Sequence, residues 1–170
     1  MDAGRTLRHV RSAEIRTLFG YLYWIRDRVL IAARDAGLSA ELRVKLVHEL
    51  DVELGWRSRL TGAQERDLDP ADFATLDTLA AHWQRDEVEM RAWLETLTDQ
   101  ALAAPPVLEK DQSFPLWYYL LHVVSHGIQE LEEAVVVLEA SGHSPRNLGF
   151  LDYADTVRVR STRCRRSRRR

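Results

Sequence analysis

The segment LLHVVSHGIQELEEAV, residues 120–135, carries two histidines and a glutamate at four-residue intervals: His122, His126 and Glu130. An α-helix turns about 100° per residue, so residues four apart lie on one face. On a helical wheel Glu130 falls inside the apolar arc of this segment, His126 at its edge and His122 farther out. A carboxylate in that position needs a cation nearby, which is an arginine, a histidinium or a metal ion.

A second segment offers another histidine. LRVKLVHELDVELGW, residues 42–56, places His48 in mid-helix between Val44 and Val52. A histidine there is either a core residue with a hydrogen-bond partner or a third ligand. One histidine from this segment and an i, i+4 pair from the first segment would give three protein ligands with open coordination positions, as in catalytic zinc sites. We expect His48 and His126 to face one interior cavity.

The elements that must position these residues are helical. Apolar spacing predicts helices over residues 5–36, 40–60, 71–98 and 116–140. Ser39 and either Asp69 or Asp72 are the expected N-caps, and the prolines at 105, 106 and 115 interrupt the chain before the last long helix. Four long helices with one longer crossover predict an all-α fold, a four-helix bundle, followed by a C-terminal segment (residues 143–154) of about one helical turn.

Composition bounds the protein class. Hydrophobic residues make up 45% and charged residues 29%, which is typical of a soluble globular domain, and no apolar run approaches the roughly 18 residues that a membrane helix needs. The N-terminal residues are too polar for a signal peptide, and the single cysteine, Cys164, cannot form an internal disulfide. We therefore expect a cytoplasmic protein without a membrane partner.

The charge is unevenly distributed. Residues 158–170 hold eight arginines and no acidic residue, whereas residues 1–157 hold 16 basic against 26 acidic residues. We expect one domain over residues 1–157 and a disordered, Arg-rich tail over 158–170 that folding does not require. Nucleic-acid binding by the tail is not expected, because it has no aromatic residue to stack on a base, and arginine greatly outnumbers lysine throughout the chain, as coding bias would produce.

Two segments together resemble the DinB/YfiT-like family. LWYYLLHVVSHGIQELEEAVVVLEASGHSPRNLGFLDY is similar to a family stretch in which a motif close to HvvNHgxxHRgq precedes a GHsP turn. The segment containing His48 and Trp56 resembles the family pattern L-x-H-x-x-x-x-E-x-x-W, with Glu53 at the acidic position. The resemblance covers about residues 10–153. It implies a DinB-like four-helix bundle, commonly a homodimer, that binds a divalent metal (zinc or nickel, sometimes iron or manganese) through three histidines.

The family's ligand positions correspond to His48, His126 and position 130, where this chain has Glu130 in place of histidine. Ser125 and Leu131 also replace the usual asparagine and arginine, and His122 matches a histidine that the family does not generally use as a ligand. Two histidines and one carboxylate form a known ligand set for zinc and for non-haem iron, and the added negative charge favours harder cations such as iron or manganese. Equally, the change could mark a member that has lost its metal.

Two functions follow as hypotheses, and no catalytic residue is identified. The first is a metal-dependent enzyme, either a transferase that uses a low-molecular-weight thiol or a hydrolase that uses water. The alternative is a non-catalytic, stress-associated bundle with a degenerate metal site, acting as a small-molecule binder or a dimeric interaction protein.

Overall fold

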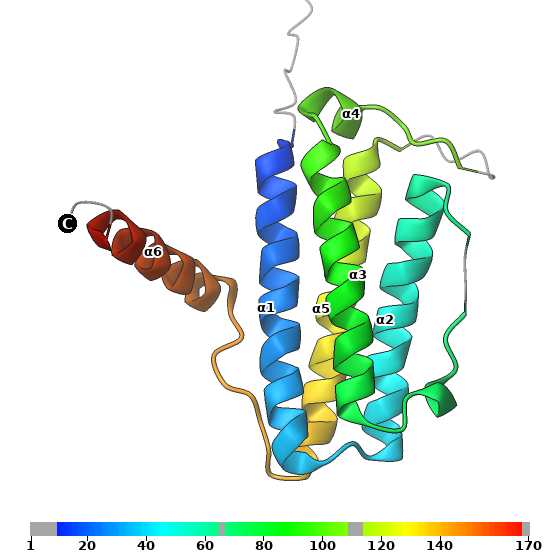
Figure 1. The fold of residues 1–170 in the computed structure, drawn as a ribbon, viewed down its shortest axis with the longest axis vertical. Coiled ribbons are helices and arrows are strands. Elements are labelled where there is room, and N and C mark those ends of the chain that lie inside the picture. Colours follow the sequence, from blue (N-terminus) through cyan, green and yellow to red (C-terminus); the bar gives the residue numbers. More distant parts are fainter. Residues whose placement is uncertain (1–9, 65–66, 109–113, 168–170) are drawn as a thin grey trace, which may run out of the picture.

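The computed structural model describes residues 10–64, 67–108 and 114–167, the last eight of these by their backbone alone. The described residues form helices and contain no β-strand. The elements in chain order are α1 (Ser12–Ala36), α2 (Ala40–Thr61), the short 3-10 helix η1 (Pro70–Asp72), α3 (Leu76–Thr96), α4 (Asp99–Ala103), α5 (Leu116–Ala140) and α6 (Phe150–Ser167). Helices α1, α2, α3 and α5 pack side by side (Figure 1), which confirms the predicted all-α four-helix bundle.

The bundle is wound so that α2 and α5 are antiparallel neighbours. Helices α1 and α5 run in one direction and α2 and α3 in the other, and α5 packs against both α1 and α2 (Figure 1). Because α2 and α3 are parallel, residues 62–75 must return along the length of the bundle between them. The Asp51 carboxylate fixes this crossover to α2 by accepting a hydrogen bond from the Leu68 amide at 2.8 Å. The segments of α2 and α5 that carry the candidate metal ligands are therefore neighbours in the bundle.

The core follows the predicted apolar spacing. The residues buried along α1 and α5 include Leu22, Ile25, Val29, Leu120, Val124, Leu131 and Leu138. Gly127 lies in the same stripe and Val135 at its edge. None of the helices in the described part of the chain combines the length and the apolarity that a membrane crossing requires.

The bounds predicted for the helices that carry the candidate ligands agree closely with the structure. Helix α5 begins and ends where expected, and α2 is one residue longer than its predicted range. The Ser39 hydroxyl accepts a hydrogen bond from the Leu42 amide, so it is the predicted N-cap of α2. Helix α1 begins only at Ser12, and residues 5–9 of its predicted range lie outside the described residues.

The prediction of a third helix over residues 71–98 was wrong at both ends. Asp69 caps only η1, and the chain leaves the helical path after it so that Phe73 enters the core. Helix α3 then begins after a new cap, Thr75, whose hydroxyl accepts a hydrogen bond from Thr78. At the other end Thr98 is not helical but caps the separate helix α4.

The C-terminal segment is also longer than predicted. Helix α6 spans Phe150–Ser167, where one helical turn and then a disordered tail were expected, and residues 168–170 of that tail lie outside the described residues. Arginine is among the better helix-forming residues, so a high positive charge alone does not prevent helix formation. Phe150 and Tyr153 pack on Tyr21 of α1, with ring centroids 5.1 and 5.7 Å away. Gly20 makes room for this contact, because a Cβ there would lie 2.5 Å from the Tyr153 hydroxyl.

That residues 158–170 are dispensable for folding stays a prediction. The described aromatic contacts of α6 lie in its first turn, so removal of residues 158–170 should lower the melting temperature by less than about 2 °C. Removal from residue 150 onward also takes Phe150 and Tyr153 and should lower it by roughly 5 °C or more. Thermal unfolding followed by circular dichroism measures both. If removal of residues 158–170 lowered the melting temperature as much as removal from residue 150 onward, the arginine-rich part would have to pack against the bundle.

Candidate metal centre

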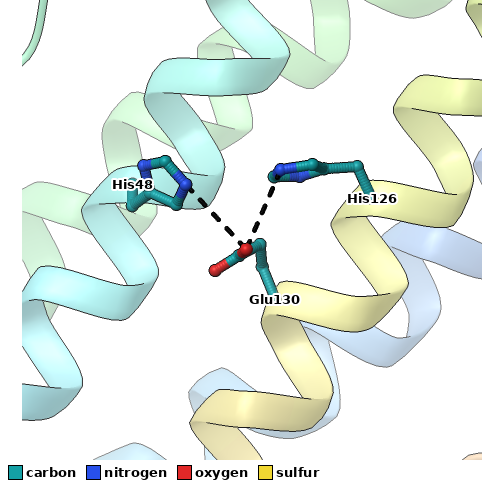
Figure 2. A group of neighbouring side chains, drawn as sticks. All are labelled: His48, His126 and Glu130. Atoms are coloured by element: carbon teal, nitrogen blue, oxygen red, sulfur yellow. Dashed lines mark ion pairs between the residues drawn. The ribbon is translucent and has the colours of Figure 1, made fainter.

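His48, His126 and Glu130 meet across the contact between α2 and α5. Figure 2 shows His48 reaching from α2 towards His126 and Glu130 of α5. One ligand atom from each residue lies within 4.8 Å of the other two. The Glu130 Oε1 atom is 3.9 Å from His48 Nε2 and 3.8 Å from His126 Nε2. The structure thus brings the three predicted metal ligands into one group.

The group is open to solvent and does not lie in the interior cavity that the sequence led us to expect. The side chain of His48 is 51% exposed, that of His126 26% and that of Glu130 12%. His48 follows the buried Val47 and shares the outer face of α2 with Val44, which is 53% exposed. The expectation failed because valines on both sides of His48 were taken to mark a buried face. As a result, a small molecule can reach the group.

The donor atoms suit a divalent cation. Ligand atoms about 2.0–2.2 Å from a tetrahedral metal lie roughly 3.4 Å from one another, so the observed separations need only small side-chain movements. In the described part of the chain the ion pairs of Glu130 are those with the two histidines. No arginine pairs with it there, and the nearby Lys45 ammonium binds Glu133 instead. Glu130 therefore faces imidazoles, which are metal ligands when neutral.

Three carboxylates surround His126. The interaction with Glu49 raises the pKa of His126, burial opposes this, and Glu130 and Glu133 add to the increase. Since a metal must displace the proton from its imidazole ligand, divalent-metal affinity should increase as the pH rises through that pKa. Glu49 Oε2 lies 3.7 Å from His126 Nδ1, on the side of the ring away from Glu130.

Two glutamates of α2 are buried, and their burial was not predicted from the sequence. Glu49 and Glu53 are each 1% exposed. Glu53 accepts hydrogen bonds from the Tyr23 hydroxyl at 2.5 Å and from Trp83 Nε1 at 3.3 Å. The signal was present, because positions 42, 46, 49 and 53 have the spacing of one helical stripe.

A cavity of about 280 Å³ adjoins the group at His126. His126 forms part of its wall, and His122 lies one turn farther along α5, edge-on to Trp56 with ring centroids 5.3 Å apart. His122 lies outside the three-residue group. The other lining residues include Asp51, Arg59 and Asp67. A ligand in this cavity would meet charges of both signs and one aromatic face.

The sequence model of the DinB family matches residues 27–163, which include α2, α3, α5 and all three residues of the group. No curated protein matches the chain.

Proposed function

The chain belongs to the DinB family, and from this membership and the site geometry we propose that it is a divalent-metal protein that activates a small nucleophile, as a thiol transferase or a hydrolase. One observation supports this most strongly. His48, His126 and Glu130 converge from two helices with ligand atoms within 4.8 Å of one another, and the exposure of the two histidines lets a small molecule reach them.

The residues around the group suit a polar substrate. When bound, a divalent cation lowers the pKa of a thiol or a water molecule at its open coordination position, which is the chemistry that both reactions need. His126 belongs both to the group and to the wall of the cavity, so a molecule in the cavity lies beside the metal ligands. Arg59, over the Trp56 ring at 5.5 Å, offers a positive charge, while Asp51 and Asp67 offer negative ones. We therefore favour a low-molecular-weight thiol that carries charged groups.

Metal content tests the proposal directly. Protein purified without a histidine tag should contain about one equivalent of zinc, nickel, iron or manganese by elemental analysis. His126→Ala should lose this metal, because it removes the ligand shared by the group and the cavity. His122→Ala is the matched control: it removes a histidine one turn away on the same helix and should keep the metal.

The same proteins distinguish the two reactions. Metal-loaded wild type should accelerate the displacement of chloride from an activated aryl chloride by cysteine or glutathione, if it is a thiol transferase, or the cleavage of an activated ester by water, if it is a hydrolase. Wild-type protein that holds no metal, and whose melting temperature does not rise on addition of any of the four ions, would contradict the proposal and favour a non-catalytic bundle.

A further inference from the structure

The carboxylate of Glu49 is buried without a hydrogen-bond partner. The residue adjoins His48 in α2, yet it points into the bundle and is 1% exposed. Neither of its carboxylate oxygens has a hydrogen-bond partner among the described residues. Such burial is unfavourable for the fold by itself, so a compensating role is expected.

The packing of α5 makes space for this carboxylate. Gly127 faces it, and a Cβ at that position would lie 2.4 Å from Glu49 Oε1 and 2.9 Å from Leu22 Cδ1. Glycine is unfavourable within a helix, and Gly127 is in the middle of α5. The buried glutamate therefore occupies a space that any larger residue at position 127 would fill.

The Glu49 side chain lies beside the ring of His126. The Glu49 Oε2 atom is 3.7 Å from His126 Nδ1, about 0.9 Å longer than a charged N–H···O hydrogen bond. His126 Nδ1 is itself buried without a hydrogen-bond partner in the described part of the chain. The opposite nitrogen, Nε2, faces Glu130 at 3.8 Å. One ring thus has a buried carboxylate at Nδ1 and the candidate ligand group at Nε2.

An imidazole that binds a metal through one nitrogen carries its proton on the other, and an acceptor there fixes the orientation of the ring. We propose that Glu49 is a positioning residue that accepts a hydrogen bond from the Nδ1–H group of His126 and so presents Nε2 to the metal. Glu49 does not belong to the ligand group itself and acts through His126. This inference rests on the proposed function, because it needs a metal at the group.

Two substitutions separate positioning from packing. Glu49→Met has a flexible side chain of similar length, so it fits beside Gly127, but its thioether sulfur is a poor hydrogen-bond acceptor. Glu49→Gln keeps an acceptor oxygen without the charge. We expect Glu49→Met to weaken zinc affinity by about ten- to a hundredfold and Glu49→Gln by less. The metal-free Met variant should also melt at a higher temperature than the wild type, because a buried carboxylate is replaced by an apolar group.

Three measurements decide the case: zinc titration, melting of the metal-free proteins and NMR of the histidine ring nitrogens. Zinc-loaded wild type should show a His126 Nδ1 proton protected from exchange, which should persist in Glu49→Gln and be lost in Glu49→Met. Glu41→Gln, at an exposed glutamate earlier on α2, is the control and should match the wild type.

Zinc binding by Glu49→Met as tight as that of the wild type, or a zinc-loaded wild type without a protected Nδ1 proton, would overturn the inference while leaving the proposed function intact. If Glu49→Met does not fold, the wild-type Nδ1 signal and the affinity of Glu49→Gln decide in the same way. A wild type that takes up none of the four ions, zinc, nickel, iron and manganese, overturns the proposed function, and the positioning role with it.

Discussion

Glu130→Ala is expected to abolish stoichiometric metal binding and the rise in melting temperature that a divalent ion causes in the wild type. Glu130 supplies the oxygen that both histidines face, at 3.9 and 3.8 Å, so its loss leaves two imidazoles on different helices. At an ion concentration 100 times the dissociation constant, binding stabilises a protein by about 2.7 kcal/mol. For a chain of this size that corresponds to a rise of roughly 5–10 °C, which the variant should not show.

Glu130→His provides the complementary result. It restores three ligands and removes one negative charge, so binding should return with a preference for zinc or nickel over iron or manganese, because imidazole is a softer donor. Titration of the four ions into the wild type and both variants, followed by melting temperature, measures the change in preference. Glu132→Ala, at an exposed glutamate of the same helix, is the matched control.

If Glu130 had a purely structural role, the opposite result would be expected. Both variants would then lose stability in the metal-free state, with metal content unchanged. The structure argues against this outcome, since the described ion-pair partners of Glu130 are His48 and His126, which carry charge only when protonated. Identical ion responses of the wild type, Glu130→Ala and Glu130→His would exclude Glu130 as a ligand.

The sequence could predict the helices and one half of the site. Helical spacing alone places His126 and Glu130 on the same face of α5, and strong end signals such as Ser39 fix the start of α2. Spacing says which face a residue occupies but not which helix packs against it. The meeting of His48 with α5 depends on the crossover that makes α2 and α5 antiparallel neighbours, so helical spacing left it a hypothesis, which the family resemblance supported.

The burial of two glutamates of α2 was not predicted. Glu49 and Glu53 lie within an apolar stripe, but glutamate is rarely buried, so helical spacing alone is a weak signal for a buried carboxylate. The helical arginines were not predicted either. The Arg-rich composition of residues 158–170 led us to expect a disordered tail, although residues up to Ser167 are helical.

The second large effect concerns Glu53, for which we expect Glu53→Gln to stabilise the metal-free protein at pH 8 but not at pH 5. Burial, with repulsion from Asp86 and Glu49, raises the pKa of Glu53 to about 8, against the hydrogen bonds from Tyr23 and Trp83. Asp86 has a positive partner, Arg57 Nη2 at 2.6 Å, whereas the hydrogen-bond partners of Glu53 are neutral. Glu53 is therefore the carboxyl group that retains its proton at neutral pH.

The direction of the pH dependence follows from proton binding. In the unfolded chain Glu53 loses its proton near pH 4.5, its ordinary value, whereas in the fold it keeps the proton until about pH 8. Between these values the folded state binds more protons at Glu53, so the contribution of Glu53 to the free energy of unfolding falls as the pH rises. This contribution is fully present below pH 4.5 and is lost as the pH passes through about 8. Glutamine has the shape of the protonated acid and does not titrate.

Glu53→Gln and the wild type should therefore have similar stability at pH 5 and diverge to roughly 2–4 kcal/mol at pH 8, with the variant the more stable. Its amide oxygen can accept the Trp83 N–H while its NH₂ group donates to the Tyr23 hydroxyl oxygen, so the buried polar contacts are retained. Urea unfolding at several pH values, with chelator present, measures the difference, and Glu132→Gln on the protein surface should show no divergence. A constant difference at every pH would mean that Glu53 does not titrate in this range, and a variant less stable throughout would mean that the core requires the carboxyl group itself.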